Sequence, residues 1–170
     1  MIASTLLASL LCGPAFGAGY KTYTNTYFLY SVDYPESWRV KELSKTAIIS
    51  SPFESKQDAF AENVEIVAED LSRVPAQPTL IDYYRKAVGG AGRLLPGFKL
   101  LEEAQTVWMG RNAVVNLYTM TDKGKTFRRR ALTFMAGHTV YVMTYSAVDS
   151  EYDTYLPQAE RIMKSIQVSP

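Results

Sequence analysis

Side chains suited to catalysis or to metal binding are scarce in this sequence. His138 is the only histidine, and it follows Gly137 at a predicted turn, where a solvated turn residue is the ordinary interpretation. Cys12 is the only cysteine, and no Gly-x-Ser-x-Gly motif surrounds a serine. Because nucleophilic catalysis needs a nucleophile beside a base, we predict no catalytic residue.

Two further patterns resemble ligand sites but have simpler interpretations. The glycine-rich run 89–93 (GGAGR) lacks the Lys-Ser/Thr ending of a phosphate loop and does not follow a strand, so a helix end is favoured. Acidic residues pair at Glu102 and Glu103 and gather in 149–153 without the spacing of a calcium loop. Such groups are typical of solvated edges and helix N-termini. The sequence therefore predicts no cofactor and no metal ion.

Positive charge is concentrated in one short stretch. The formal net charge is +1, yet the eight residues 123–130 hold five cations: Lys123, Lys125, Arg128, Arg129 and Arg130. The near-neutral total argues against a nucleic-acid partner. In a strand, Arg128 and Arg130 share a face. We select Lys123, Lys125, Arg128 and Arg130 as a partner-binding site for an acidic protein or for anionic membrane head groups.

Two other interpretations of this cluster remain open. The cations could form an ordinary solvated sheet face. They could also pair with a nearby acidic strand, for which Glu102 and Glu103 are the candidates. Tyrosine presents a similar choice, because five of the twelve tyrosines lie between residues 20 and 34. They suit either an interface or ordinary strand composition.

The N-terminal segment is typical of a secretory signal. Residues 1–19 carry no charged side chain, and a leucine-rich run is followed by Gly13 and Pro14. Small residues at positions 15 and 17 favour cleavage after Gly17, so the mature domain is predicted to span 18–170. No Lys or Arg lies near Met1, unlike most signals. A lipoprotein acylated at Cys12 and a buried N-terminal helix are the alternatives.

Hydrophobic periodicity predicts an α+β fold. Predicted helices cover 79–88, which Thr79 can cap and 89–90 end, and 157–166, with Pro157 in the first turn. Short turns at 110–112 and 122–125 imply antiparallel pairing of the strands that they join. The predicted strands are 27–34, 38–43, 47–50, 63–71, 98–108, 113–118, 127–135 and 139–147.

Several motifs, in this order, resemble the PsbP-like and DcrB-like proteins. They are the strand-to-tryptophan entry 30–38 (YSVDYPESW), the pair Tyr83 and Tyr84, the hairpin 110–113, the Tyr-x-x-Tyr segment 152–155 and a helix ending in Ile166. The resemblance covers about residues 23–167. It implies an antiparallel β-sheet flanked by helices, a PsbP-like α/β/α sandwich. Members of the family are mostly exported or thylakoid-lumen proteins that act by docking, and no catalytic residue can be carried over.

These observations predict a non-catalytic binding or docking protein of the cell envelope, periplasmic or otherwise extracytoplasmic. Its expected partner is another envelope protein or complex, with the membrane surface as a second possibility. The alternative function is a small-ligand-binding protein or a hydrolase that uses a pocket between sheet and helices.

Export gives the first testable prediction. The intact mass of the protein from its native host should correspond to a chain that begins at Ala18. A mass that retains residues 1–17 would contradict export by cleavage. A lipid adduct on Cys12 would instead support the lipoprotein alternative.

Overall fold

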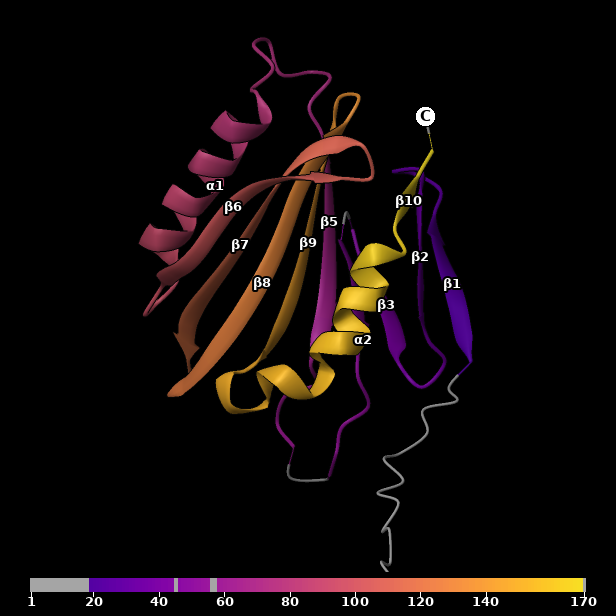
Figure 1. The fold of residues 1–170 in the computed structure, drawn as a ribbon, viewed down its shortest axis with the longest axis vertical. Helices are drawn as coiled ribbons and strands as arrows, with labels where there is room; N and C mark the ends of the chain where they lie inside the picture. The colour runs from indigo at the N-terminus through magenta and orange to yellow at the C-terminus, as the bar shows by residue number, and fades with distance from the viewer. Residues whose placement is uncertain (1–18, 45, 56–57, 170) are drawn as a thin grey trace, which may run out of the picture.

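A computed structural model describes residues 19–44, 46–55 and 58–169 of the 170-residue chain (Figure 1). The predicted signal peptide and Cys12 lie outside these residues. The helices are α1 (Leu80–Leu94) and α2 (Tyr152–Lys164), and a short 3₁₀ turn (Asp149–Glu151) precedes α2. The strands are β1 (Tyr20–Asn25), β2 (Tyr30–Pro35), β3 (Arg39–Leu43), β4 (Thr46–Ser50), β5 (Asn63–Asp70), β6 (Lys99–Trp108), β7 (Arg111–Asp122), β8 (Lys125–Ala136), β9 (Thr139–Val148) and β10 (Gln167–Val168).

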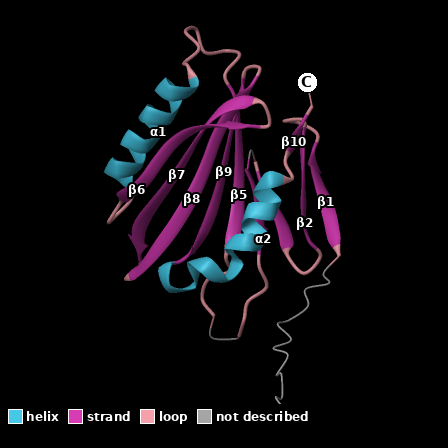
Figure 2. Cartoon of the chain, viewed as in Figure 1, coloured by secondary structure: helices cyan, strands magenta, loops and turns pink. Residues whose placement is uncertain are grey.

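The strands form two antiparallel sheets. Seven strands pair in the order β3-β4-β5-β9-β8-β7-β6, and three pair in the order β1-β2-β10. Helix α1 packs against one face of the large sheet, and α2 lies between the large sheet and the small one (Figure 2). The predicted α+β fold, with an antiparallel sheet and packed helices, is confirmed.

The core lies where α2 meets both sheets. Strand β5 alternates as the sequence predicts, so Val64, Ile66 and Ala68 are fully buried on the α2 face. From the helix, Ala159 and Ile162 are also fully buried, because the helical period places them on one stripe.

Hydrogen bonds tie the small sheet to the rest of the domain. The Tyr141 hydroxyl of β9 donates to the Phe28 carbonyl oxygen at 2.7 Å. The Asp33 amide of β2 donates to the Ser165 side chain at 2.8 Å, just after α2. These bonds cross between segments far apart in the sequence, so they fix the position of the small sheet.

Both helices begin or end differently from prediction. Helix α1 is capped by Thr79 as expected, but it continues through Gly89 and Gly90 to Leu94. Packing against the sheet therefore outweighs the cost of about 1 kcal/mol for each helical glycine. Helix α2 begins at Tyr152 rather than Pro157, because the 3₁₀ turn leads directly into it and Tyr152 is buried.

Several strand bounds also differ. The sequence missed β1 and the two-residue β10, and the strand expected over 27–34 begins only at Tyr30. A turn precedes it, in which Leu29 has a φ of 52°. The next difference is the β6–β7 turn, which lies at 109–110 rather than 110–112. The hairpin at Lys123 and Gly124 is as predicted, with φ of 47° and 77°, the conformation of a type I′ turn.

Gly97 provides a test of how tightly α1 is joined to the sheet. It has a φ of 63°, and an added Cβ would lie 2.7 Å from Thr121 Oγ1. Gly110 also has a positive φ, 74°, but an added Cβ there meets nothing within 4 Å. Both alanine substitutions force a residue with a Cβ into a positive φ, which destabilises the backbone. Only Gly97→Ala adds a steric clash, with Thr121. We expect Gly97→Ala to lower the free energy of unfolding by about 1–3 kcal/mol more than Gly110→Ala in urea denaturation. Equal losses would contradict the close packing at Thr121.

Candidate docking surface

The basic cluster begins at the turn between β7 and β8. Lys123 and Lys125 flank Gly124, and all three are exposed. The two-residue turn suits the right-handed twist of its strands, so the hairpin projects the lysines from the end of a well-paired ladder. No ion pair joins either lysine to another residue in the described part of the chain. Their charges are therefore free to meet a partner.

The arginines of β8 divide between the two faces of the large sheet. Arg128 and Arg130 face α2, as strand alternation predicts, and Arg129 points to the face that carries α1. The five cations thus do not form one continuous patch. By the same alternation Lys125 lies on the Arg129 side of β8, so the hairpin lysines and the two α2-facing arginines are separate parts of the surface.

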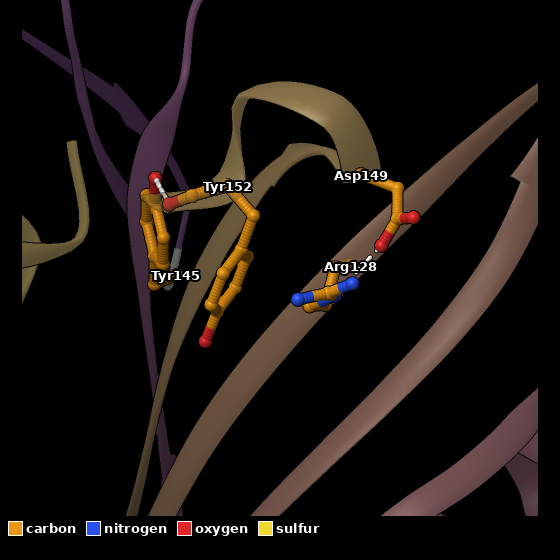
Figure 3. Close-up of polar contacts among 4 residues, drawn as sticks. All are labelled: Arg128, Tyr145, Asp149 and Tyr152. Atoms are coloured by element: carbon orange, nitrogen blue, oxygen red, sulfur yellow. Dashed lines mark hydrogen bonds and ion pairs between the residues drawn. The ribbon is translucent and has the colours of Figure 1, made fainter. Parts of the chain in front are cut away.

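Arg128 is bound to the segment that starts α2. Its Nε lies 2.7 Å from Asp149 Oδ1, and its guanidinium lies 5.1 Å from the centre of the Tyr152 ring (Figure 3). The Tyr145 hydroxyl donates to the Tyr152 carbonyl oxygen at 2.8 Å, which holds the same turn from β9. Arg128 therefore stabilises the approach to α2.

Arg130 is held more loosely. Its Nη1 lies 3.8 Å from Glu160 Oε1, and the other oxygen of Glu160 contacts Lys164 Nζ at 3.0 Å. Glu103, one candidate partner from the sequence, instead accepts a hydrogen bond from the Tyr84 hydroxyl on the opposite face. The acidic groups that pair with Arg128 and Arg130 come from α2 and the turn before it.

Arg130 lies in an open groove on the α2 side of the sheet. Two adjoining hollows of about 100 and 710 Å³ share Trp108, Val115 and Arg130. Glu160 and Lys164 form the α2 wall of the smaller hollow, and the larger one extends over β6 and β7. The Trp108 indole nitrogen is buried without a hydrogen-bond partner among the described residues. This is the expected location of a pocket between sheet and helix.

Most ionisable groups with shifted pKa values lie away from this groove, and the exception is Tyr152, whose pKa is raised by burial and partly lowered by the nearby Arg130. Burial raises the pKa of several tyrosines, including Tyr83 and Tyr84, each of which also donates to a glutamate. Burial likewise raises the pKa of Glu62, which accepts a bond from Ser51 at 3.3 Å. Hydrogen bonds from Ser72 lower the pKa of Asp70. None of these residues lines the Arg130 groove.

The histidine that the sequence offers for other chemistry makes contacts that hold the fold together. His138 lies in the β8–β9 turn, with Nδ1 2.8 Å from Gln77 Oε1 and its carbonyl oxygen accepting from the Leu71 amide. It therefore ties the linker before α1 to the sheet. Across residues 19–44, 46–55 and 58–169, no three His, Cys, Asp or Glu side chains are grouped to hold a metal ion. In the same residues, no helix has the length and apolar character needed to cross a membrane.

The contrast between the two arginines is testable by urea denaturation. Arg128→Gln should lower the free energy of unfolding by about 1 kcal/mol, because it removes a short charged hydrogen bond and a ring contact that are about one-third exposed. Arg130→Gln, the matched control, should cost less than about 0.5 kcal/mol. A double-mutant cycle with Asp149→Asn should recover most of the Arg128 effect as coupling. A larger loss for Arg130→Gln would contradict the assignment of Arg128 as the structural residue.

The fold is shared with solved structures of low sequence identity. No protein-family model and no curated protein matches the sequence. The solution structure of cyanobacterial PsbP (CyanoP) from Synechocystis matches with a TM-score of 0.65 and 18% identity, over 93% of this chain and 97% of that one. A Pseudomonas aeruginosa protein of unknown function matches with a TM-score of 0.64 and 20% identity, over 89% and 98%. LpqN of Mycobacterium tuberculosis, described as involved in cell envelope biogenesis, matches with a TM-score of 0.53 and 19% identity, over 91% and 88%. With its two antiparallel sheets and the helix between them, this chain has the PsbP-like fold.

Proposed function

We propose that this chain is a non-catalytic docking protein of the cell envelope that acts outside the cytoplasm. One observation carries the proposal: Lys123 and Lys125 are exposed on a two-residue hairpin turn and form no ion pair among the described residues. The preformed turn spares a partner the cost of ordering the backbone, although each lysine side chain that is immobilised still loses rotamer freedom. The lysines attract an acidic surface and orient it during encounter.

The location outside the cytoplasm rests on two supports. The N-terminal segment has the composition of a secretory signal, so the mature domain would span 18–170. The fold is also that of LpqN, which is described as acting in cell envelope biogenesis. The proposed partner is an acidic envelope protein. Binding to anionic lipid in place of a protein is an outcome that the experiment below distinguishes.

The four selected residues would have different roles in docking. Lys123 and Lys125 supply accessible charge. Arg130 can exchange its loose contact with Glu160 for a carboxylate of the partner, since Glu160 keeps its closer contact with Lys164. Arg128 positions the surface by holding the start of α2. Replacing Arg128 with glutamate would place two carboxylates together at Asp149, so stability as well as binding would fall.

The lysines give the clearest test of the proposal. Cross-linking in the native envelope, followed by mass spectrometry, should capture an acidic protein with the wild-type chain. The double variant Lys123→Gln/Lys125→Gln should capture several-fold less at unchanged melting temperature. Its matched control is Lys21→Gln/Lys41→Gln, which makes the same charge change at exposed positions on β1 and β3.

Salt should weaken the same complex, because exposed charges are screened over about 8 Å at physiological ionic strength. Equal loss of capture in both double variants would mean that capture depends on the net charge of the protein and not on the position of the hairpin lysines. Unchanged capture in both would remove the hairpin from the interface. Cross-links to lipid alone would replace the proposed protein partner with the membrane surface.

A further inference from the structure

A further hollow, separate from the two that make up the Arg130 groove, lies on the other side of α2. It has a volume of about 310 Å³ and opens where the start of β1, the β2–β3 turn and the segment after β4 meet the helix. Rings form most of its walls: Tyr20, Trp38 and Tyr155 are aromatic, and Pro35, Pro52 and Pro157 are prolines. We call it the ring cleft.

The aromatic walls of the ring cleft are fixed by their own contacts. The Arg161 guanidinium lies 3.8 Å from the centre of the Tyr20 ring. Trp38 and Tyr155 meet edge to face, with ring centres 5.9 Å apart. Burial and the neighbouring Glu54 raise the pKa of Tyr155 to about 12, so its phenol stays neutral at physiological pH. A ligand would therefore meet preformed ring surfaces and would order few side chains on binding.

Polar groups in the ring cleft define what the ligand must carry. Arg161 is exposed at the rim and brings a positive charge with several N–H donors, and the Ser37 hydroxyl is a further donor. The Gln158 side-chain oxygen is buried without a hydrogen-bond partner among the described residues. An unsatisfied buried acceptor costs about 1–3 kcal/mol, which an N–H from a ligand would offset.

We propose that the ring cleft binds an extended polyproline II segment of a partner protein in which an acidic residue stands beside prolines. Proline rings pack on aromatic faces, and the preformed helix loses little entropy on binding. Its free carbonyl oxygens accept from Ser37 and Arg161. The acidic residue pairs with Arg161, and its amide supplies the N–H that Gln158 lacks.

Other occupants fit these features less well. A fatty acid places its chain on the apolar rings and its carboxylate on Arg161, but it carries no N–H donor for Gln158. An α-helix is about 10–12 Å wide with its side chains and needs a longer groove than a hollow of about 310 Å³. A polyproline II segment is narrow, and its backbone is fully available for hydrogen bonds. The site uses none of the residues proposed for the basic docking surface.

Peptide binding measured by fluorescence anisotropy tests the proposal. The probe is a labelled peptide of repeating Pro-Pro-Asp, compared with Gly-Ser-Asp of equal charge and with Pro-Pro-Ser. We expect the wild-type protein to bind Pro-Pro-Asp with a Kd in the micromolar range, and about ten-fold more tightly than either comparison peptide. Arg161→Gln should weaken Pro-Pro-Asp binding about five-fold or more and leave Pro-Pro-Ser binding nearly unchanged. Tyr20→Leu should weaken binding of both proline peptides.

Matched controls separate the site from general effects. Lys164→Gln removes a cation one turn further along α2, and Tyr27→Leu removes a 78% exposed tyrosine outside the cleft. Neither should change peptide binding, and the variants should share the wild-type circular dichroism spectrum. Lys123→Gln/Lys125→Gln should also bind the peptide normally, so failure of the hairpin proposal and failure of this one are distinguishable. Equal affinity for Gly-Ser-Asp, no binding at millimolar peptide, or unchanged binding by Tyr20→Leu and Arg161→Gln would each overturn the proposal.

Discussion

The burial of one helix between two sheets is the constraint on which the rest of the structure depends. Ala159 and Ile162 of this helix are fully buried and Met163 is nearly so, and Ile166 just after the helix is fully buried as well. Burying an isoleucine or methionine side chain contributes about 1.5–3 kcal/mol. The small β1-β2-β10 sheet packs against α2 through β2, so these contacts help to hold it in the domain. The Arg130 groove and the ring cleft both border the polar sides of this helix.

The two exposed flanks of helix α2 border different hollows. On one flank, Glu160 and Lys164 border the Arg130 groove, because β6 and β7 extend beyond the area that the helix covers. On the other flank, Tyr155 and Arg161 meet the start of β1 and the turn after β2. The packing that creates the core therefore also fixes the geometry of both hollows. A partner in the Arg130 groove or in the ring cleft would contact this helix, whereas the lysines meet a partner from the β7–β8 turn.

The sequence predicts those parts of the fold that strong local patterns determine. The alternation in β5, the Thr79 cap and the apolar stripe of α2 are each visible within a few residues. Strand β1 was missed because its pattern is mostly polar and it belongs to a small sheet with one partly exposed face. The glycines at 89 and 90 suggested a helix end, since local propensity does not include the packing of α1 on the sheet.

The candidate surfaces were only partly predictable for a related reason. Strand alternation alone places Arg128 and Arg130 on one face, and their positions in the structure agree. Their acidic partners lie 21 and 30 residues away along the chain, at Asp149 and Glu160, so no local pattern identifies them. The ring cleft is harder still to foresee, because its walls come from four separate segments that only the position of α2 brings together.

Buried polar atoms without partners give the two hollows a common physical character. Among the described residues, six side chains carry such an atom, and those of Tyr30, Glu62, Arg129 and Tyr152 lie outside both hollows. The other two are the Trp108 indole nitrogen, a donor in the Arg130 groove, and the Gln158 side-chain oxygen, an acceptor in the ring cleft. Leaving such an atom unpaired costs about 1–3 kcal/mol. A bound partner that supplies the missing group recovers this cost only when it is in place, so these atoms favour the bound state without adding to the stability of the free domain.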